Sequence, residues 1–224
     1  MLLVEVIKSI FNRSPKIQDK LASSDELTSK VLNVGGGTKK IKIPDHYNNW
    51  KHLLLDIDPG GEVDIVMDAR KLKNLPAGQF DAVYCSHNLE HYFKHDVATV
   101  LAGFLHVLKP DGFAEIHVPN MRGVLKHFID TGMEIDDTLY VSPSGPISVL
   151  DVIYGLGKQI ESTGVDFYAH KTGFTETSLM KTLQLSGFAQ VWIAGTSDTF
   201  GIRALAFKQY PTPSQVALLG LGSI

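Results

Sequence analysis

Short apolar runs alternate with longer amphipathic segments along most of the chain. Four runs in the first 86 residues have the length of buried strands. They are expected at 30–34, 52–56, 65–67 and 82–86. Between 97 and 108, apolar residues recur at intervals of three and four, which predicts a helix capped by Asp96. Strands that alternate with helices are typical of an α/β fold, whose mostly parallel sheet is covered on both faces.

The alternation continues to a fifth strand and is then interrupted. The sequence Lys109-Pro110-Asp111-Gly112 predicts the end of the helix, and 113–118 is the next strand candidate. A short helix is expected at 121–130. The stretch 131–172 carries Pro and Gly without a clear period, so we expect it to be irregular.

Regular structure resumes near the end of the chain. Thr175 is suited to cap a helix that runs to 185, with Gly187 at its carboxyl end. Two apolar segments, 191–194 and 202–207, are separated by polar residues. They predict an antiparallel pair that closes the sheet.

Composition fits one folded domain. Hydrophobic residues make up 44% and charged residues 20% of the 224 positions, so nothing suggests disorder, and a net charge of -3 gives no overall basic footprint for nucleic acid. Cys85 is the single cysteine, so no internal disulfide can form, and a reducing, cytoplasmic location is expected. Neither a signal peptide nor an integral membrane segment is expected, because no cleavage site follows the apolar opening and no apolar stretch is long enough.

The expected organisation is one main domain with two flanking segments. An amino-terminal helical extension is expected at 1–30, the main domain at 31–208 and a carboxyl-terminal tail at 209–224. Within the main domain, about 120–174 is expected to be a lid or substrate-binding insertion. No internal repeat and no second hydrophobic core are expected.

The first predicted strand runs into the glycines Gly35, Gly36 and Gly37, and the second ends at Asp56. A ligand that lies against the backbone leaves no room for a Cβ atom, which favours glycine. A carboxylate can accept hydrogen bonds from both hydroxyls of a ribose. Because the carboxyl ends of parallel strands meet at one edge of the sheet, the pattern predicts a nucleoside-binding site there.

The glycine spacing argues against a dinucleotide. Gly35 and Gly37 fill the first two places of a Gly-x-Gly-x-x-Gly motif, but Lys40 stands in the third. Pro44 also interrupts the short segment before the next strand, so a long helix facing a pyrophosphate is not expected. A nicotinamide-dependent oxidoreductase is therefore a less favoured alternative.

Seven short segments in order carry a resemblance to a known family. They are LNVGGG, LLLDIDP, VDIVMDAR, FDAVYCSHNLEH, VLKPDG, IHVP and HKTGFT. With them the chain resembles the class I S-adenosylmethionine-dependent methyltransferases, in particular predicted methyltransferases encoded among surface-polysaccharide genes. The resemblance implies a Rossmann-like three-layer sandwich, with a mostly parallel seven-stranded sheet and a closing antiparallel hairpin. A non-catalytic binding module with the same fold is a further alternative.

The resemblance implies S-adenosylmethionine as cofactor and a role for each site residue. The glycines would lie beneath the methionine portion, with Ser86 and His87 beside its chain and sulfonium. Asp56 would bind the ribose and Ile57 would pack on the adenine. Asp68 and the Ala69 amide would bind the adenine edge, whereas Asp58 is expected to be an ordinary acid because Pro59 turns the chain away. Asn33 stands where many methyltransferases have an acid; its amide can accept a hydrogen bond but supplies no charge.

A general base is needed only if the methyl acceptor is a hydroxyl. His91 or His170 is the expected base and Glu90 its orienting partner. The alternative for His91, as for His87, is a helix-start residue bonded to the backbone. His117 is expected to be a satisfied strand histidine. A metal site built from His87, Glu90 and His91 is considered and not favoured, because no fourth ligand is evident.

The acceptor is expected to contact the insertion. Its aromatic set can stack on a sugar or form the small core of a lid. The set comprises Tyr140, Tyr154, Phe167, Tyr168 and His170. Gly155 and Gly157 are candidates for a hinge or for the end of a helix. The resemblance favours a small-molecule or glycan-precursor substrate methylated at a hydroxyl.

Overall fold

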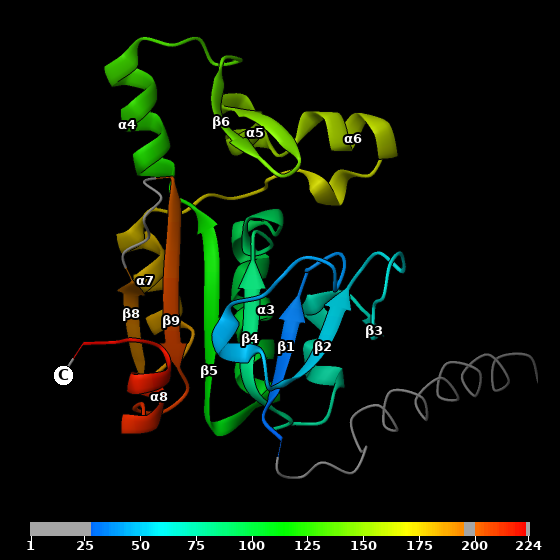
Figure 1. Cartoon of the computed structure of the whole chain (residues 1–224), viewed down its shortest axis with the longest axis vertical. Coiled ribbons are helices and arrows are strands. Elements are labelled where there is room, and N and C mark those ends of the chain that lie inside the picture. Colours follow the sequence, from blue (N-terminus) through cyan, green and yellow to red (C-terminus); the bar gives the residue numbers. More distant parts are fainter. Residues whose placement is uncertain (1–27, 195–199, 223–224) are drawn as a thin grey trace, which may run out of the picture.

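The computed structural model describes residues 28–194 and 200–222, and in it seven strands form one sheet (Figure 1). The strands are β1 (Lys30–Val34), β2 (Lys51–Asp56), β3 (Ile65–Val66), β4 (Phe80–Ser86), β5 (Leu108–Pro119), β8 (Gln190–Ala194) and β9 (Gly201–Phe207). Their order is β3-β2-β1-β4-β5-β9-β8. The strands β1 to β5 pair in parallel, and β9 is antiparallel to both β5 and β8. The expected fold class and its closing hairpin are confirmed.

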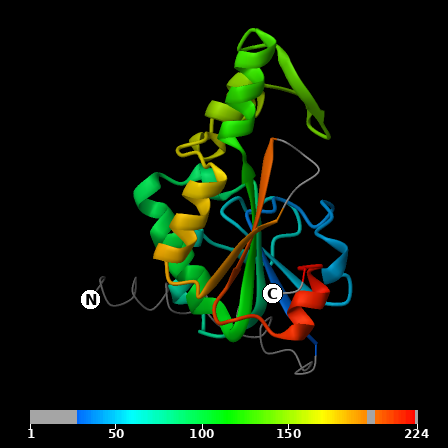
Figure 2. The same cartoon turned by 90° about the vertical axis from the view of Figure 1, so that its left-hand side faces the viewer.

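Helices cover both faces of this sheet, as Figure 2 shows edge-on. The α-helices are α3 (Lys94–Val107), α7 (Glu176–Leu185) and α8 (Pro213–Leu218), and the 3-10 helices beside them are η1 (Asp45–Tyr47), η2 (Ala69–Asn74) and η3 (Leu89–His91). Between β1 and β2 the only helix is η1, as expected from Pro44. The chain thus lacks a long helix whose amino terminus faces a pyrophosphate there.

The two faces of the sheet bury two separate apolar clusters. Successive strand residues point to opposite faces, so Leu32 packs under α3 and α7 while Val31 packs toward η1 and α8. Both side chains are fully buried, and so is Phe104 of α3. Burying one such side chain stabilises the fold by about 1.5–3 kcal/mol. Burial on both faces explains why these strands appear in the sequence as continuous apolar runs.

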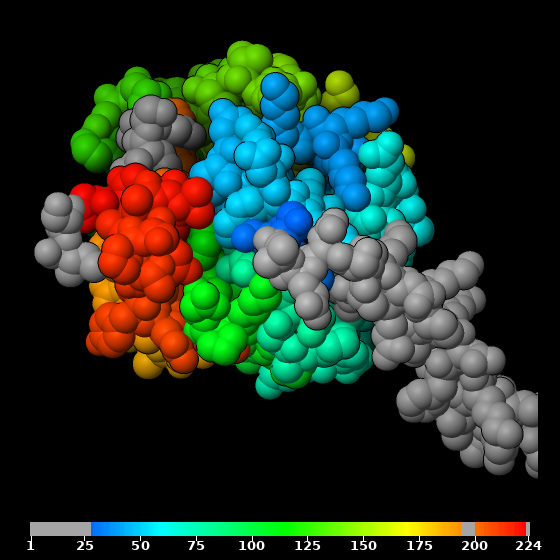
Figure 3. All heavy atoms as spheres, turned by 60° about the horizontal axis from the view of Figure 1, so that its bottom comes forward, coloured from blue at the N-terminus to red at the C-terminus, as the bar shows by residue number. Residues whose placement is uncertain are grey.

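The carboxyl-terminal segment completes the second cluster. Thr212 caps α8 through a capping box with Gln215, and Pro213 occupies the first helical turn. Leu219 then packs with Tyr47 and Trp50. Figure 3 shows this segment, coloured orange to red, beside the blue residues that follow β1.

The insertion after β5 is regular, which corrects the prediction that 131–172 is irregular. It contains α4 (Met121–Thr131), β6 (Thr138–Ser142), β7 (Gly145–Ser148), α5 (Val149–Tyr154), α6 (Gly157–Thr163) and η4 (Asp166–Tyr168). The strands β6 and β7 form a separate antiparallel sheet. Val124, Val149 and Val152 form a third apolar cluster here, so the expectation of no second core is wrong. In Figure 1 the insertion stands beyond the carboxyl ends of the parallel strands.

Local boundaries agree with the sequence in some places and differ in others. Thr175 caps α7 through a capping box with Ser178, and Gly187 follows with a φ of +105°, as predicted. The helix α3 starts earlier than expected, after Phe93, so Asp96 lies in its first turn instead of capping it. The strand β5 also starts earlier, at Leu108, because Leu108 pairs with Phe80 across a bulge.

Two further predictions concern the amino-terminal extension and membrane-spanning helices. The expected amino-terminal extension lies almost wholly outside the described residues. No helix among residues 28–194 and 200–222 has the length and apolar character needed to cross a membrane.

Candidate active site

A pocket of about 450 Å³ opens at the carboxyl ends of β1, β2 and β4. Six of the residues predicted to bind the cofactor line it, and so does His91. The six are Gly35, Gly37, Asp56, Ile57, Asp68 and His87. Other lining residues were not predicted from the sequence, among them Thr38, Gly60, Gly61, Arg70, Asn88, Tyr92, Phe93, Asp96 and Lys171.

The glycine loop has steric reasons for its composition. Gly35 has a φ of +74°, and a Cβ atom there would lie 2.1 Å from the side-chain nitrogen Nδ2 of Asn88. A Cβ atom on Gly36 would lie 2.3 Å from the Asn33 side chain. Gly37 has a φ of +63° with open space around it. Side chains on the first two glycines would displace the residues that shape the pocket wall.

The carboxylate of Asp56 links the glycine loop to the residues that follow β2. Oδ2 accepts a hydrogen bond from the Gly37 N–H at 2.9 Å, and Oδ1 accepts one from the Asp58 N–H at 3.0 Å. A carboxylate has about four acceptor positions, so two stay available to a ligand. Ile57 lines the pocket beside it with 44% of its surface exposed.

Asp58 also lines the pocket, which corrects the expectation that it is an ordinary acid. Its Oδ1 accepts a hydrogen bond from the Gly60 N–H at 2.9 Å, so the turn after Pro59 folds back over the site. The hydroxyl of Tyr168 donates to Asp58 Oδ2 at 3.3 Å. The insertion therefore reaches the edge of the pocket.

Asp68 is paired more closely than the sequence suggested. Its carboxylate accepts hydrogen bonds from the backbone N–H of Arg70 at 2.9 Å and from the Arg70 guanidinium at 2.6 Å. Burial raises the pKa of the Asp68 carboxyl, but Arg70 lowers it more, so the carboxyl is ionised at neutral pH. Arg70 also contacts Asp96 at 3.2 Å. This pairing fixes the direction of the carboxylate at the pocket wall.

Four predicted cofactor residues do not line the pocket. Gly36 lies against Asn33, whose side chain is buried and whose Oδ1 has no hydrogen-bond partner among the described residues. Ala69 packs its side chain into the main core. Ser86 ends β4, where it pairs with His117.

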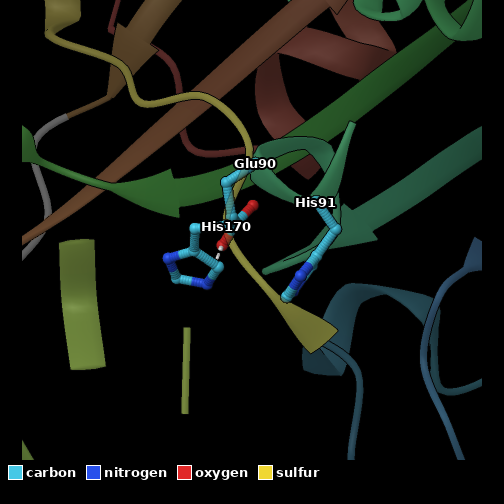
Figure 4. Close-up of side chains that lie close together, drawn as sticks. All are labelled: Glu90, His91 and His170. Carbon is cyan, nitrogen blue, oxygen red and sulfur yellow. Dashed lines mark ion pairs between the residues drawn. The ribbon is translucent and has the colours of Figure 1, made fainter. Parts of the chain in front are cut away.

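Glu90, His91 and His170 form a compact cluster beside the pocket. One ligating atom from each lies within 4.8 Å of the other two. The Glu90 carboxylate points toward the His170 ring, with His91 on the neighbouring side (Figure 4). His170 Nε2 lies 4.0 Å from Glu90 Oε1, and the two imidazole rings meet edge to face at 4.8 Å. The structure thus brings together the three residues predicted to carry the chemistry.

The cluster is held by backbone hydrogen bonds. The N–H groups of Lys171 and Thr172 both donate to the Glu90 carbonyl, at 2.8 and 3.1 Å. His170 Nδ1 lies 2.8 Å from the Val152 carbonyl, and His91 Nδ1 lies 3.2 Å from the Ala169 carbonyl. A carbonyl only accepts hydrogen bonds, so in each ring Nδ1 carries the proton. Nε2 is left with the lone pair in the neutral ring.

Burial and charge act on these groups in opposite directions. Burial raises the pKa of the Glu90 carboxyl, but His87, His91 and His170 lower it more, so its pKa lies below its usual value. Burial lowers the pKa of His91, and Glu90 offsets only part of this effect. The cluster therefore combines an ionised carboxylate with an imidazole that is neutral at pH 7.

Two further histidines, His87 and His117, differ in their surroundings. His87 has a φ of +49°, unusual for a residue with a side chain, and its Nδ1 lies 3.5 Å from Glu90 Oε1. Backbone strain of this kind costs about 1–3 kcal/mol and is found mainly at functional sites. His117 Nε2 lies 3.2 Å from Glu115 Oε1 on β5, which agrees with the expected satisfied strand histidine.

The aromatic residues of the insertion divide between core and pocket. Phe167 and Tyr168 line the pocket, whereas Tyr140 packs in the third apolar cluster. Tyr154 is 62% exposed. Gly155 ends α5 with a φ of +94°, and a Cβ atom there would lie 2.4 Å from the Tyr168 carbonyl oxygen.

Comparisons with known proteins find one matching family model and several solved structures of similar fold. Residues 34–116 match a family model described as a methyltransferase domain. A sequence search finds no significant match among curated proteins. Among solved structures, the PH0226 protein from Pyrococcus horikoshii OT3 is similar, with 16% identity, a TM-score of 0.52, and coverage of 88% of this chain and 90% of that one.

Two other solved structures match at lower TM-scores. A SAM dependent methyltransferase from Archaeoglobus fulgidus has 17% identity, a TM-score of 0.49, and coverage of 91% of this chain and 94% of that one. The CurJ carbon methyltransferase has 12% identity, a TM-score of 0.48, and coverage of 81% of this chain. The match spans about half, 49%, of the CurJ chain.

The family match covers the part of the chain that builds the pocket. It runs from the end of β1 through β4 and into β5, and so includes the glycine loop, Asp56 and the residues that follow β4. The sheet order with its antiparallel β9 agrees with the same assignment. The comparisons thus support a methyltransferase domain over residues 34–116, with S-adenosylmethionine as its cofactor.

Proposed function

We propose that this enzyme transfers the methyl group of S-adenosylmethionine to a hydroxyl of a small molecule or glycan precursor, and that Glu90, His91 and His170 activate that hydroxyl. One observation carries the proposal. His91 lines the same pocket as Gly35 and Asp56, so a base candidate and the predicted cofactor residues face one cavity.

The cofactor would lie across the carboxyl ends of β1 and β2. The glycine loop would contact its methionine portion, and Asp56 would accept hydrogen bonds from the ribose hydroxyls. Ile57 offers an apolar surface to adenine, and Asp68 an acceptor for its amine. His87 lies on the wall that leads from this region toward Glu90, which favours a sulfonium position near the cluster.

The acceptor would enter from the side of the insertion. Phe93, Phe167 and Tyr168 line this part of the pocket and offer flat surfaces for a sugar or another ring. The Lys171 ammonium lies 5.6 Å from the Phe93 ring centre and also lines the pocket. A cation at this position favours an acceptor that carries negative charge.

The reaction needs alignment and the removal of one proton. The acceptor oxygen forms a bond to the methyl carbon while the carbon–sulfur bond breaks and its electron pair stays on sulfur. The hydroxyl proton passes to an imidazole nitrogen. His91 is favoured over His170 for this contact, since His91 lines the pocket and His170 does not. Glu90 would orient the rings and offset the developing positive charge.

Methyl transfer from labelled S-adenosylmethionine to a panel of nucleotide sugars and simple glycans tests the proposal. We expect a methylated hydroxyl product, and a decrease of about 10²–10⁴-fold in His91→Ala. His95→Ala is the matched control, because that imidazole is on α3 with 80% of its side chain exposed. Products methylated only at amines or thiols would contradict a hydroxyl acceptor. A protein that shows no heat with S-adenosylhomocysteine would contradict the placement of the cofactor.

A further inference from the structure

The cluster of Glu90, His91 and His170 has the composition of a metal site. Two imidazoles and one carboxylate, from η3 and from the chain after η4, present ligating atoms within 4.8 Å of one another (Figure 4). We propose that these three residues bind a divalent transition-metal ion, with zinc as the best match. Two histidines and a glutamate are a known donor set for zinc that keeps a fourth position open.

The state of both rings suits metal binding. The carbonyl oxygens of Val152 and Ala169 fix the protons of His170 and His91 on Nδ1. Metal-ligating histidines usually donate their other N–H in this way, which fixes the ring and leaves the opposite nitrogen for the ion. For His170 that nitrogen, Nε2, is the atom on the Glu90 side, 4.0 Å from Oε1.

Glu90 supplies an independent reason to expect a cation. Its side chain is 1% exposed, and neither carboxylate oxygen has a hydrogen-bond partner among the described residues. A buried ionised carboxylate that lacks hydrogen-bond partners is costly in free energy, because it has lost its hydration. The nearest ring nitrogens, at 3.5 and 4.0 Å, do not replace that hydration. A divalent cation between Glu90 and the two rings would do so.

The three ligand atoms lie up to 4.8 Å apart, so an ion would draw the widest pair together by about 1.4 Å. Tetrahedral bonds of about 2.1 Å place neighbouring ligand atoms about 3.4 Å apart. The separation of 4.0 Å between His170 Nε2 and Glu90 Oε1 must therefore shorten by roughly half an ångström. The backbone bonds from Lys171 and Thr172 to the Glu90 carbonyl already hold the two chain segments together.

The donor set differs from the metal site considered from the sequence. His87, Glu90 and His91 share short spacing, but the structure replaces His87 with His170, 80 positions after Glu90 (170 minus 90). His87 lies 3.5 Å from Glu90 Oε1 on the pocket side. The third ligand is thus one that only the fold brings near.

If the proposed function holds, the ion changes how the hydroxyl is activated. A ring nitrogen bound to the ion has no lone pair left for a proton, so His91 would act as a ligand and no longer as the base. An acceptor hydroxyl bound at the open position would have a lowered pKa and lose its proton to water. This consequence rests on the proposed function, whereas metal binding itself does not.

Calorimetric titration of tag-free, chelator-treated full-length protein with Zn²⁺ and Co²⁺ tests the site. We expect one equivalent to bind, and cobalt to give visible absorption bands of a low-coordinate site. Glu90→Gln, His91→Ala and His170→Ala should each weaken binding by at least about 100-fold, since even outer residues of metal sites contribute 10–100-fold. His95→Ala, on an exposed part of α3, should bind as the wild type does.

Binding of S-adenosylhomocysteine by each variant checks that the fold is intact. The proposal would be overturned if the wild type bound neither zinc nor cobalt. It would also be overturned if the folded Glu90→Gln, His91→Ala and His170→Ala variants bound these metals as tightly as the wild type. Tight metal binding without methyl transfer to any hydroxyl would support this site and count against the proposed function. Methyl transfer to a hydroxyl at full rate by a protein that binds neither metal would support the proposed function and contradict the metal site.

Discussion

The hydroxyl of Tyr168 donates a hydrogen bond to Asp58 across 110 positions of sequence, at 3.3 Å. Tyr168 belongs to η4 of the insertion, and Asp58 follows β2 in the main domain. Both residues line the pocket, so this bond joins the insertion to the proposed cofactor site. Cofactor binding and the position of the insertion should therefore depend on each other.

Tyr168→Phe should weaken S-adenosylhomocysteine binding without unfolding the protein. One hydrogen bond is worth about 1 kcal/mol, which corresponds to about a five-fold rise in Kd. Calorimetry on the two proteins gives this difference directly. Tyr154→Phe is the control, because that ring is 62% exposed and outside the pocket. Equal affinities in Tyr168→Phe and the wild type would show that the bond does not close the pocket.

Asp56→Asn should weaken cofactor binding more strongly. Both carboxylate oxygens accept backbone N–H groups, from Gly37 and Asp58. An amide would turn an N–H toward one of these donors and would also lose the charge-assisted bonds to a ribose. Such bonds contribute about 1.5–3 kcal/mol, so we expect Kd for S-adenosylhomocysteine to rise about 10–100-fold. The exposed Asp111→Asn serves as the control for loss of one charge.

Gly35→Ala and Gly132→Ala separate steric conflict from backbone strain. Both glycines have a left-handed φ, +74° and +65°, so each alanine costs about 1–2 kcal/mol in strain. A Cβ atom on Gly35 would also lie 2.1 Å from the Asn88 side chain, whereas the space around Gly132 is open. We expect a larger loss of unfolding free energy and at least ten-fold weaker cofactor binding in Gly35→Ala alone.

Urea unfolding and calorimetry measure these two effects. Gly132→Ala should bind S-adenosylhomocysteine as the wild type does, because its helix end lies in the insertion and away from the pocket. Similar losses in both variants would mean that Asn88 moves aside freely.

The sequence predicted the helices and strands that depend on residues close together in the chain. Continuous apolar runs located the buried strands, and Thr175 located the start of α7 through a capping box that depends on residues three apart. The glycine loop and Asp56 were found in the same way, since each lies next to a strand end. These signals were enough for the fold class and for part of the pocket wall.

Contacts between distant segments could not be read from such patterns. Pro59 suggested that Asp58 turns away, but Tyr168 reaches it from the insertion. The stretch 131–172 looked irregular because its small core leaves several apolar residues exposed, such as Val141 and Leu150, and so blurs the period. Arg70 was missed because its pairing with Asp96 depends on how η2 packs against α3.

A second buried carboxylate, Glu115 on β5, ties the opposite face of the sheet together. Its Oε2 accepts hydrogen bonds from Tyr47 at 2.9 Å and from His46 at 2.8 Å. Its Oε1 lies 3.2 Å from His117 Nε2 and 2.6 Å from Arg203 Nε. Four partners from η1, β5 and β9 therefore meet on a side chain that is fully buried.

Glu115→Gln should destabilise the fold and reduce its sensitivity to acid. Burial raises the pKa of Glu115, but His117, His46 and Arg203 lower it far more, so the folded-state pKa lies well below the unfolded value of about 4.3. Its stabilising contribution is complete above about pH 4.3 and is lost as the pH falls toward the folded-state pKa. Removing one member of a buried ion pair costs about 3–5 kcal/mol, which we expect as the loss of unfolding free energy at pH 7.

Urea unfolding from pH 7 to pH 3 should then give a shallower fall in unfolding free energy for Glu115→Gln than for the wild type. The exposed Glu62→Gln should follow the wild-type curve. Parallel curves for all three proteins would mean that other carboxylates cause the acid sensitivity.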